Sequence, residues 1–321
     1  ELHALDPRKG DIAWTYKLPG LPDSFSYVQV AGDAIILDTG NKHDSGSTVV
    51  SLNSSTGEVR WTQRRATLGA GQFTTTQDTI CKIDTTLASS NDIVCLNVRT
   101  GNESWRKSGY SRYDSHLTSA GNTLYVDINY MKDKEAYLYV SALDAKTGKV
   151  KWAVDMALKG LIPSPKEPRA VFLTADEKGV YGIISQQSDS NILFSLDPEN
   201  GGIKWKTTLG FFSYNWAYQK GNTWVYPAGK VLLFFTRSAK TDVYAFDADD
   251  GKQLYQLKGL KIFPFLNSRF MSYEPLFSDS HNFYSFGDDD KTIYVHDNQT
   301  GKILQKFSLP HFPYLAAVSP R

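Results

Sequence analysis

The chain of 321 residues lacks the features that define several common protein classes. It has only two cysteines, which excludes a small fold held together by many disulfides. Its 35 lysines and arginines nearly balance its 34 aspartates and glutamates, so it has no basic excess of the kind that binds nucleic acid or an anionic membrane. The longest apolar stretches resemble residues 231–235, far shorter than a membrane-spanning helix. We therefore expect no nucleic-acid partner and no membrane span.

Motifs for metal binding and nucleophilic catalysis are also missing. The histidines show no HxH or HExxH spacing, and no serine lies in a G-x-S-x-G context. The acidic runs 247–251 and 288–290 fall in expected turns, and neither continues into a calcium-binding loop. We predict no metal site and no catalytic residue.

A short motif recurs seven times in the chain. Each copy has an Asp or Asn, a Gly four residues later and an aromatic slot eight residues later. The Asp or Asn positions are Asp6, Asn53, Asn97, Asp144, Asp197, Asp247 and Asp297. Their separations of 47, 44, 47, 53, 50 and 50 residues indicate an array of similar structural units along the whole chain.

Each motif has the composition of a β-hairpin. The residues before the Asp or Asn are apolar and often β-branched, as in 243–246, which is typical of a strand. The Asp or Asn side chain can bind backbone amides two residues on, and the Gly tolerates positive φ, so a tight reversal is expected. Two more strand-like runs precede each hairpin, for example 117–120 and 123–128. Each unit is therefore predicted to be a four-stranded antiparallel meander.

Four strands in about 45 residues, without helical periodicity, are typical of a β-propeller blade. We predict an all-β protein that forms a single β-propeller domain over residues 1–321. Seven blades are the simpler count, and eight are the alternative. The N-terminus enters at a third strand and residues 314–318 have the composition of a first strand, so both termini are expected to close the ring in one blade.

The aromatic slot supplies the predicted contact between blades. Tyr255 and Gln305 fill the slot in the last two copies. A buried indole removes roughly 150 to 250 Å² from water, which is worth on the order of 4 to 6 kcal/mol as an upper bound. We therefore interpret the tryptophans of the first five copies as structural docking residues rather than ligand contacts. They are Trp14, Trp61, Trp105, Trp152 and Trp205.

Residues 142–152, which read Ala-Leu-Asp-Ala-Lys-Thr-Gly-Lys-Val-Lys-Trp, resemble the tryptophan-docking motif of the PQQ-like, quinoprotein alcohol dehydrogenase-like propellers. Quinoprotein dehydrogenases share this motif with the propeller lipoprotein of outer-membrane assembly. For the dehydrogenases the resemblance implies pyrroloquinoline quinone, calcium, a catalytic aspartate and often a disulfide between adjacent cysteines. This chain has no adjacent cysteines and is close to bare repeats. We expect the scaffold without the cofactor, with the quinone and calcium as the alternative.

Cys81 and Cys95 fall in the predicted second and third strands of one blade. Such a hairpin can place them opposite each other, so a cross-strand disulfide and two buried thiols are both open. Sequons at Asn53, Asn102 and Asn298 hint at a secretory route. Together with a disulfide and the resemblance, they favour a secreted or periplasmic location.

Two groups of residues are candidates for binding. His116, Arg169 and Arg269 each lie 28 residues before a repeat aspartate, at the entrance to a predicted first strand. Because first strands line the channel of a propeller, these cations could form a funnel for an anionic ligand, including a quinone carboxylate. The alternative is that they are ordinary surface charges.

The second group is aromatic and lies in the connector 211–218. Tyr214, Trp216 and Tyr218 are candidates for contact with a protein or a glycan at the rim. The alternative is that the connector buries its own rings.

The sequence thus favours a non-catalytic, extracytoplasmic binding or assembly scaffold that uses its rim loops. A shortened quinone-dependent oxidoreductase and a carbohydrate-binding propeller are the alternatives. Self-assembly through an unpaired strand edge of the composite blade is a further hypothesis.

Overall fold

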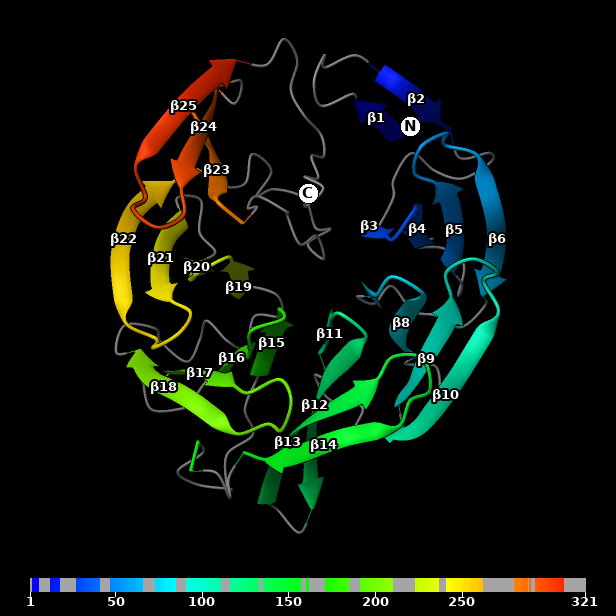
Figure 1. Ribbon diagram of the computed structural model, residues 1–321, viewed down its shortest axis with the longest axis horizontal. Coiled ribbons are helices and arrows are strands. Elements are labelled where there is room, and N and C mark those ends of the chain that lie inside the picture. The colour runs from blue at the N-terminus through cyan, green and yellow to red at the C-terminus, as the bar shows by residue number, and fades with distance from the viewer. Residues whose placement is uncertain are drawn as a thin grey trace. The chain divides into compact units, whose positions relative to one another are not determined.

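The computed structural model describes residues 2–5, 12–17, 27–40, 47–65, 73–84, 91–110, 116–132, 135–156, 160–161, 171–184, 191–209, 223–236, 241–261, 280–287, 289 and 292–308. These residues form antiparallel sheets, which we name A to G in chain order (Figure 1). Sheets B to F each contain four strands that pair in sequence order, whereas the described parts of sheets A and G contain two and three.

The strands have the following bounds. Sheet A contains β1 (Leu2–Leu5) and β2 (Ile12–Tyr16). Sheet B contains β3 (Tyr27–Ala31), β4 (Ala34–Gly40), β5 (Ser47–Asn53) and β6 (Val59–Arg65). Sheet C contains β7 (Phe73–Thr75), β8 (Thr79–Asp84), β9 (Asn91–Asn97) and β10 (Glu103–Tyr110). Sheet D contains β11 (Leu117–Ala120), β12 (Thr123–Lys132), β13 (Glu135–Asp144) and β14 (Val150–Asp155).

The remaining sheets follow the same plan. Sheet E contains β15 (Val171–Ala175), β16 (Val180–Ile184), β17 (Asn191–Leu196) and β18 (Ile203–Leu209). Sheet F contains β19 (Thr223–Ala228), β20 (Val231–Thr236), β21 (Thr241–Asp247) and β22 (Gln253–Leu260). Sheet G contains β23 (Asn282–Phe286), β24 (Thr292–Asp297) and β25 (Ile303–Ser308).

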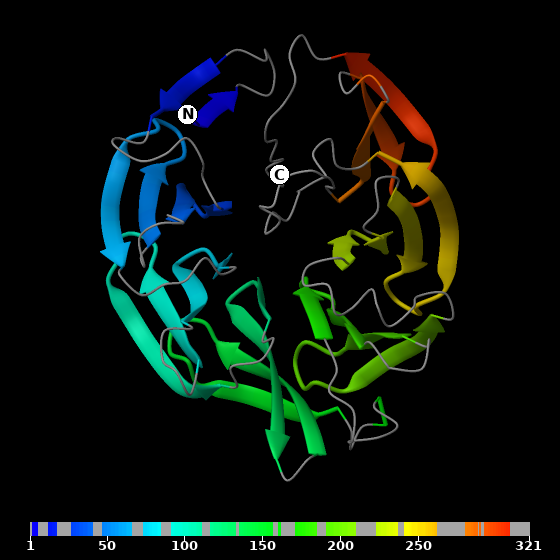
Figure 2. The same ribbon diagram turned by 180° about the vertical axis from the view of Figure 1, so that it is seen from behind.

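The chain divides into two compact units. The first unit comprises residues 1–130 and 141–152, and the second comprises residues 131–140 and 153–321. Sheets A, B and C and most of sheet D belong to the first unit, and sheets E, F and G belong to the second. Within each unit the sheets follow one another in chain order, as seen from both sides (Figures 1 and 2). The first strands of successive sheets are neighbours: β3 contacts β7 and β7 contacts β11 in the first unit, and β15 contacts β19 in the second.

The repeat motif forms the predicted turn between the third and fourth strands. In sheet D the Asp144 carboxylate accepts hydrogen bonds from the backbone N–H groups of Lys146 and Thr147 at 3.1 and 2.9 Å. Gly148 closes the turn with φ of 69°, a conformation that a residue with a Cβ rarely adopts. The same arrangement recurs at Asn53, Asn97, Asp247 and Asp297.

The hydrophobic core lies between neighbouring sheets. Sheets B and C pack through a cluster that includes Ile36, Val49, Phe73 and Val94. Further clusters join A to B, C to D, E to F and F to G. Because side chains alternate between the two faces of a strand, sheets B, C and F each contribute one face to the cluster before them and the other face to the cluster after them.

The tryptophan side chains at the aromatic position of the motif form a second kind of contact between neighbouring sheets, here called the docking joint. The indole Nε1–H of Trp105 donates a 2.8 Å hydrogen bond to the carbonyl of Ala145, the residue that follows the repeat Asp of the next sheet. The ring also covers Gly148, where a Cβ would lie only 2.8 Å from Cε3 of the indole. Trp14, Trp61 and Trp205 make the same pair of contacts with the next sheet. Trp152 lies in β14 with its ring centroid 5.9 Å from that of Tyr125.

Between sheets F and G, Tyr255 makes the docking contact that tryptophan makes between other sheets. The hydroxyl of Tyr255 donates a 2.7 Å hydrogen bond to the carbonyl of Asn298, which also follows a repeat Asp. The ring lies over Gly301, where a Cβ would be 2.9 Å from Cε2 of the tyrosine. Gln305, in the slot of the last copy, is exposed.

The five complete meanders confirm the predicted all-β class and the four-stranded antiparallel blade. The single domain, the number of blades and closure by both termini stay predictions.

Candidate functional site

A groove opens in the first unit where the first strands of sheets B, C and D end. Its volume is about 380 Å³, and its lining comes from the turns β3–β4, β7–β8 and β11–β12 and the strand ends beside them. The lining residues are Val30, Gly32, Thr75, Thr76, Gln77, Ser119, Gly121 and Asn122. All of them are uncharged, and none is aromatic.

Hydroxyl groups bridge the three strands at this groove. The Thr75 hydroxyl donates to the carbonyl of Val30 at 3.0 Å, and the Ser119 hydroxyl donates to the carbonyl of Thr75 at 2.8 Å. Because the Ser119 proton is used in this way, the Thr74 hydroxyl donates to the Ser119 oxygen at 2.7 Å. β3, β7 and β11 are edge strands of their sheets, so these bonds occupy backbone carbonyls that would otherwise be exposed.

Glycine lets the turns of sheets B and C approach each other. Gly32 has φ of 58°, and a Cβ there would lie 3.1 Å from the carbonyl oxygen of Gln77. Gly121 has φ of 53°, and a Cβ there would meet nothing within 4 Å. The groove is therefore tight beside Gly32 and open beside Gly121.

The two carboxylates next to the groove, Asp33 and Asp78, each form an ion pair with a basic side chain. Asp33 follows Gly32, and Arg60 donates to its two oxygens at 2.8 and 2.7 Å. This pairing lowers the pKa of Asp33 to about 2. Asp78 follows Gln77 and lies 2.8 Å from Nζ of Lys146, whose hydrogen bond lowers the pKa of Asp78. Each carboxylate therefore has a basic partner on its own or the next sheet.

His116 lies at the start of β11, and the groove lies at the other end of this strand. Its backbone N–H donates to Asp127 Oδ1, and its Nδ1 lies 3.4 Å from Asp127 Oδ2. Asp127 is fully buried, and burial raises its pKa while the contact with His116 opposes the rise. The His116 side chain is 24 % exposed. His116 thus belongs to a carboxylate–imidazole pair within sheet D.

The other predicted binding residues lie outside the described part of the chain. These residues are Arg169, Arg269, Tyr214, Trp216 and Tyr218. The funnel of cations and the aromatic rim therefore stay predictions.

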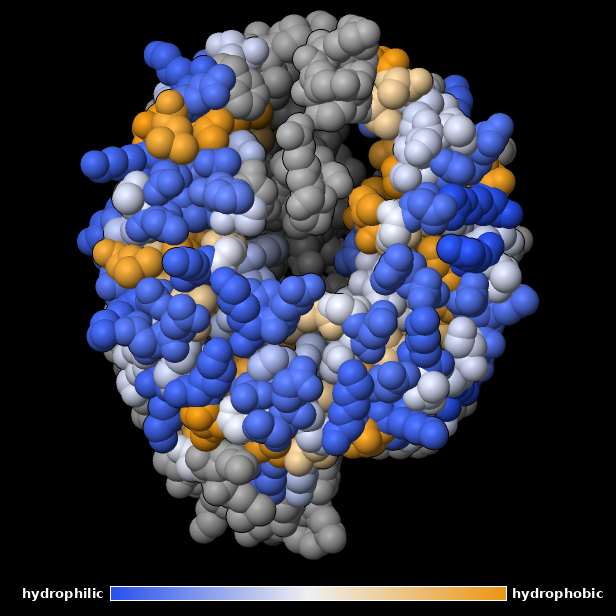
Figure 3. Space-filling model, viewed as in Figure 1, coloured by the Kyte–Doolittle hydropathy of each residue, from blue (hydrophilic) through white to orange (hydrophobic). Residues whose placement is uncertain are grey.

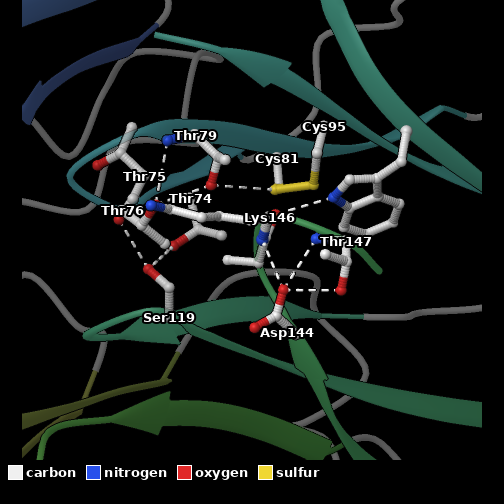
Figure 4. The surroundings of a disulfide bond; sticks show 12 residues. Thr74, Thr75, Thr76, Thr79, Cys81, Cys95, Ser119, Asp144, Lys146 and Thr147 are labelled. Carbon is white, nitrogen blue, oxygen red and sulfur yellow. Dashed lines mark hydrogen bonds between the residues drawn. A yellow bond between two sulfur atoms is a disulfide. The ribbon is translucent and has the colours of Figure 1, made fainter. Parts of the chain in front are cut away.

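Cys81 and Cys95 form a disulfide bond between the directly paired strands β8 and β9 (Figure 4). Both residues are fully buried in the cluster between sheets C and D, against which Trp105 packs. Thr79 lies on the same strand as Cys81, and its hydroxyl shares a 2.7 Å hydrogen bond with that of Thr76, a lining residue of the groove. The disulfide therefore covalently links two strands of sheet C, which contributes the middle part of the groove.

Two observations on the described residues concern metals and membranes. No three His, Cys, Asp or Glu side chains gather there in a way that could hold a metal ion. Within the same residues, no helix has the length and hydrophobicity to cross a bilayer.

The face of the molecule in Figure 3 is mostly hydrophilic where it is described. Large apolar side chains that are exposed include Ile12, Val59, Val150 and Ile303, and each is the first residue of the strand that follows a repeat turn. On the described part of this face, apolar surface lies in separate small areas (Figure 3), which do not resemble a large hydrophobic interface.

A comparison with curated protein sequences found no match. Among solved structures, BamB from Moraxella catarrhalis is 17% identical, with 93% of this chain and 78% of that chain covered and a TM-score of 0.48. The quinohemoprotein alcohol dehydrogenase of Comamonas testosteroni is 14% identical over 98% of this chain and 65% of that chain, with a TM-score of 0.54. Dihydro-heme d1 dehydrogenase NirN is 12% identical over 96% of this chain and 61% of that chain, with a TM-score of 0.56.

The chain spans less than two thirds of the length of these two dehydrogenases. At such identities the likeness concerns the fold alone, and it confirms the β-propeller type expected from the repeats. The family model described as outer membrane protein assembly factor BamB matches residues 1–123 and 136–301, in both units. The chain therefore belongs to this family of PQQ-like repeat propellers, as the resemblance of its tryptophan-docking motif indicated.

Proposed function

We propose that the protein is a non-catalytic scaffold that binds other proteins in an extracytoplasmic compartment. The observation that carries this proposal is the match to an assembly-factor family across both units of the chain. Apolar clusters and aromatic docking contacts join sheets B, C and D directly, so the packing of these sheets requires no bound group.

The disulfide supports the proposed location. Disulfides persist in oxidising compartments and are rare in the cytosol, where thiols are kept reduced. Cys81 and Cys95 are bonded and fully buried. Acid quenching of source cells, alkylation under denaturing conditions and mass spectrometry without reduction should find both residues in the disulfide. Alkylation of both thiols would refute the proposed location.

The scaffold role is tested by purification from the native source after mild cross-linking. We expect the protein to co-purify with a partner protein in fixed proportion, and to reduce no artificial electron acceptor when pyrroloquinoline quinone and Ca²⁺ are added. Recovery of the protein without any partner would contradict the proposal.

An oxidoreductase is the second candidate, because two dehydrogenase structures align with 96 to 98% of this chain. This function predicts quinone-dependent reduction of the acceptor by the purified protein. The predicted partners for the quinone carboxylates, Arg169 and Arg269, lie outside the described residues. Saturable dye reduction that is lost in both Arg169→Ala and Arg269→Ala would favour this candidate over the scaffold.

A further inference from the structure

The groove between the turns of sheets B, C and D has two side chains with unused hydrogen-bonding capacity. Gln77 and Asn122 are exposed, and neither side-chain amide bonds to another residue in the described part of the chain. The hydroxyls of Thr75 and Ser119, in contrast, are used to bridge the strands. In the groove, the Thr75 and Ser119 hydroxyls are therefore already bonded, whereas the side-chain amides of Gln77 and Asn122 have no bond to the described residues.

The chemistry of the lining selects among ligand classes. Because none of the described residues that line the groove is charged, they offer no charge-assisted bond to a phosphate or a carboxylate. Because none of these described residues is aromatic, they offer no flat ring on which a sugar could stack. A primary amide has both an N–H donor and a carbonyl acceptor, so it complements the N–H and C=O groups of a peptide backbone.

The mode of contact follows from the same bonds. An added strand would need free backbone groups along an edge, but the carbonyls of Val30 and Thr75 already accept hydroxyl protons. Gln77 and Asn122 must therefore supply the hydrogen bonds, with Val30, which is 46 % exposed, as the apolar contact. The volume of about 380 Å³ lies in the lower range of small-ligand sites, and thus suits a short segment rather than a folded domain.

We propose that this groove, here named the BCD groove, binds a short, extended and uncharged polar segment of a partner protein. The proposal rests on the scaffold function and specifies one place on the scaffold where a partner binds.

The direct test uses defined probes with the full chain. Capped nine-residue peptides composed of Gly, Ser, Thr, Asn and Gln are titrated by calorimetry, alongside versions in which three residues are Glu or Lys, and alongside maltoheptaose. We expect the neutral peptides to bind more tightly than either charged version. Gln77→Ala and Asn122→Ala should each weaken binding about fivefold, the equivalent of one net hydrogen bond, and the double variant roughly 25-fold.

Two further variants make the test specific. Gly121→Asn places a side chain in the open part of the groove at a positive φ that asparagine tolerates, so it should abolish peptide binding. Gln253→Ala removes an exposed amide on β22 in the second unit and should leave binding unchanged. Each variant is compared with the parent by circular dichroism and thermal unfolding, because substitutions at exposed residues should preserve the fold.

The proposal is overturned if the neutral peptides do not bind, or if they bind equally well to the Gln77→Ala, Asn122→Ala double variant. Binding of maltoheptaose that the double variant loses would also overturn it, in favour of a carbohydrate site. The native purification separates this outcome from failure of the scaffold function. A partner that still co-purifies with the double variant refutes the BCD groove alone, whereas the absence of any partner from the parent protein refutes the scaffold.

Discussion

Two glycines of sheet D, Gly148 and Gly121, allow the contact of Trp105 with the next sheet to be tested against a matched control. Gly148 and Gly121 both lie in turns of sheet D, with φ of 69° and 53°. A Cβ at position 148 would lie 2.8 Å from Cε3 and 2.9 Å from Cδ2 of Trp105, whereas a Cβ at position 121 would meet nothing within 4 Å. Gly148→Ala and Gly121→Ala therefore share the backbone penalty and differ in the contact with the indole.

The expected magnitudes follow from these distances. Alanine in the left-handed region costs roughly 1 to 2 kcal/mol at either position. At position 148 the methyl group would also be closer to the indole than the 3.5 to 4.0 Å of a normal carbon contact, and overpacking of this kind costs about 1 to 3 kcal/mol more. If the indole moves away, its hydrogen bond to Ala145 is weakened as well.

Urea unfolding followed by tryptophan fluorescence and far-ultraviolet circular dichroism measures the difference. We expect Gly121→Ala to lower the free energy of unfolding by about 1 to 2 kcal/mol. Gly148→Ala should lower it by at least about 1 kcal/mol more. Equal losses in the two variants would show that the indole does not press on the turn, and would refute the docking joint.

Three further predictions concern the disulfide, the tyrosine joint and a buried histidine. Replacing Cys81 and Cys95 by Ala removes a cross-link between residues 14 positions apart. The free energy of unfolding in urea should then fall by about 3 kcal/mol. An unchanged free energy of unfolding would contradict a stabilising role for the disulfide. Tyr255→Phe keeps the ring but removes the hydrogen bond to Asn298, and it should cost about 1 kcal/mol in the same assay, with a neutral effect refuting the joint. Burial lowers the pKa of His296, so the unfolded chain takes up a proton before the folded one and stability should fall as the pH drops below about 6.5. His296→Leu should lose less stability than the parent between pH 7.5 and 5.5, and an identical pH dependence would refute the assignment.

The fold could be predicted because its determinants are local and repeated. In the Asp144–Gly148 turn, the carboxylate, the amides that it binds and the glycine lie within five residues, so composition alone indicates the reversal. The eight-residue distance to the aromatic slot, which is the same in every copy, then predicts which ring meets the next turn. The joint at Tyr255 was less obvious from the sequence, because the phenol differs from an indole in shape. Tyr255 makes the contact because its hydroxyl donates to the carbonyl of the residue that follows the repeat Asp. The indole N–H of Trp105 donates to the corresponding carbonyl in the next sheet.

The BCD groove could not be predicted in this way. Its residues resemble ordinary turn and strand-end residues, and they become a site only where turns from three sheets meet. The sequence instead directed attention to the opposite end of the first strands, where His116 lies. Its partner Asp127 is 11 residues away on the next strand, so the spacing of cations relative to the repeat could not reveal the pair.

The groove and the docking contact between sheets C and D are connected through one residue, Ala145. The backbone N–H of Ala145 donates to the carbonyl of Asn122 at 3.0 Å, and the carbonyl of Ala145 accepts from the Trp105 indole at 2.8 Å. The side chain of Asn122 lines the BCD groove. A partner that fixes Asn122 would therefore also steady the turn that holds sheets C and D together. Peptide binding should accordingly slow amide hydrogen exchange at Ala145, and an unchanged exchange rate there would show that groove and joint are independent.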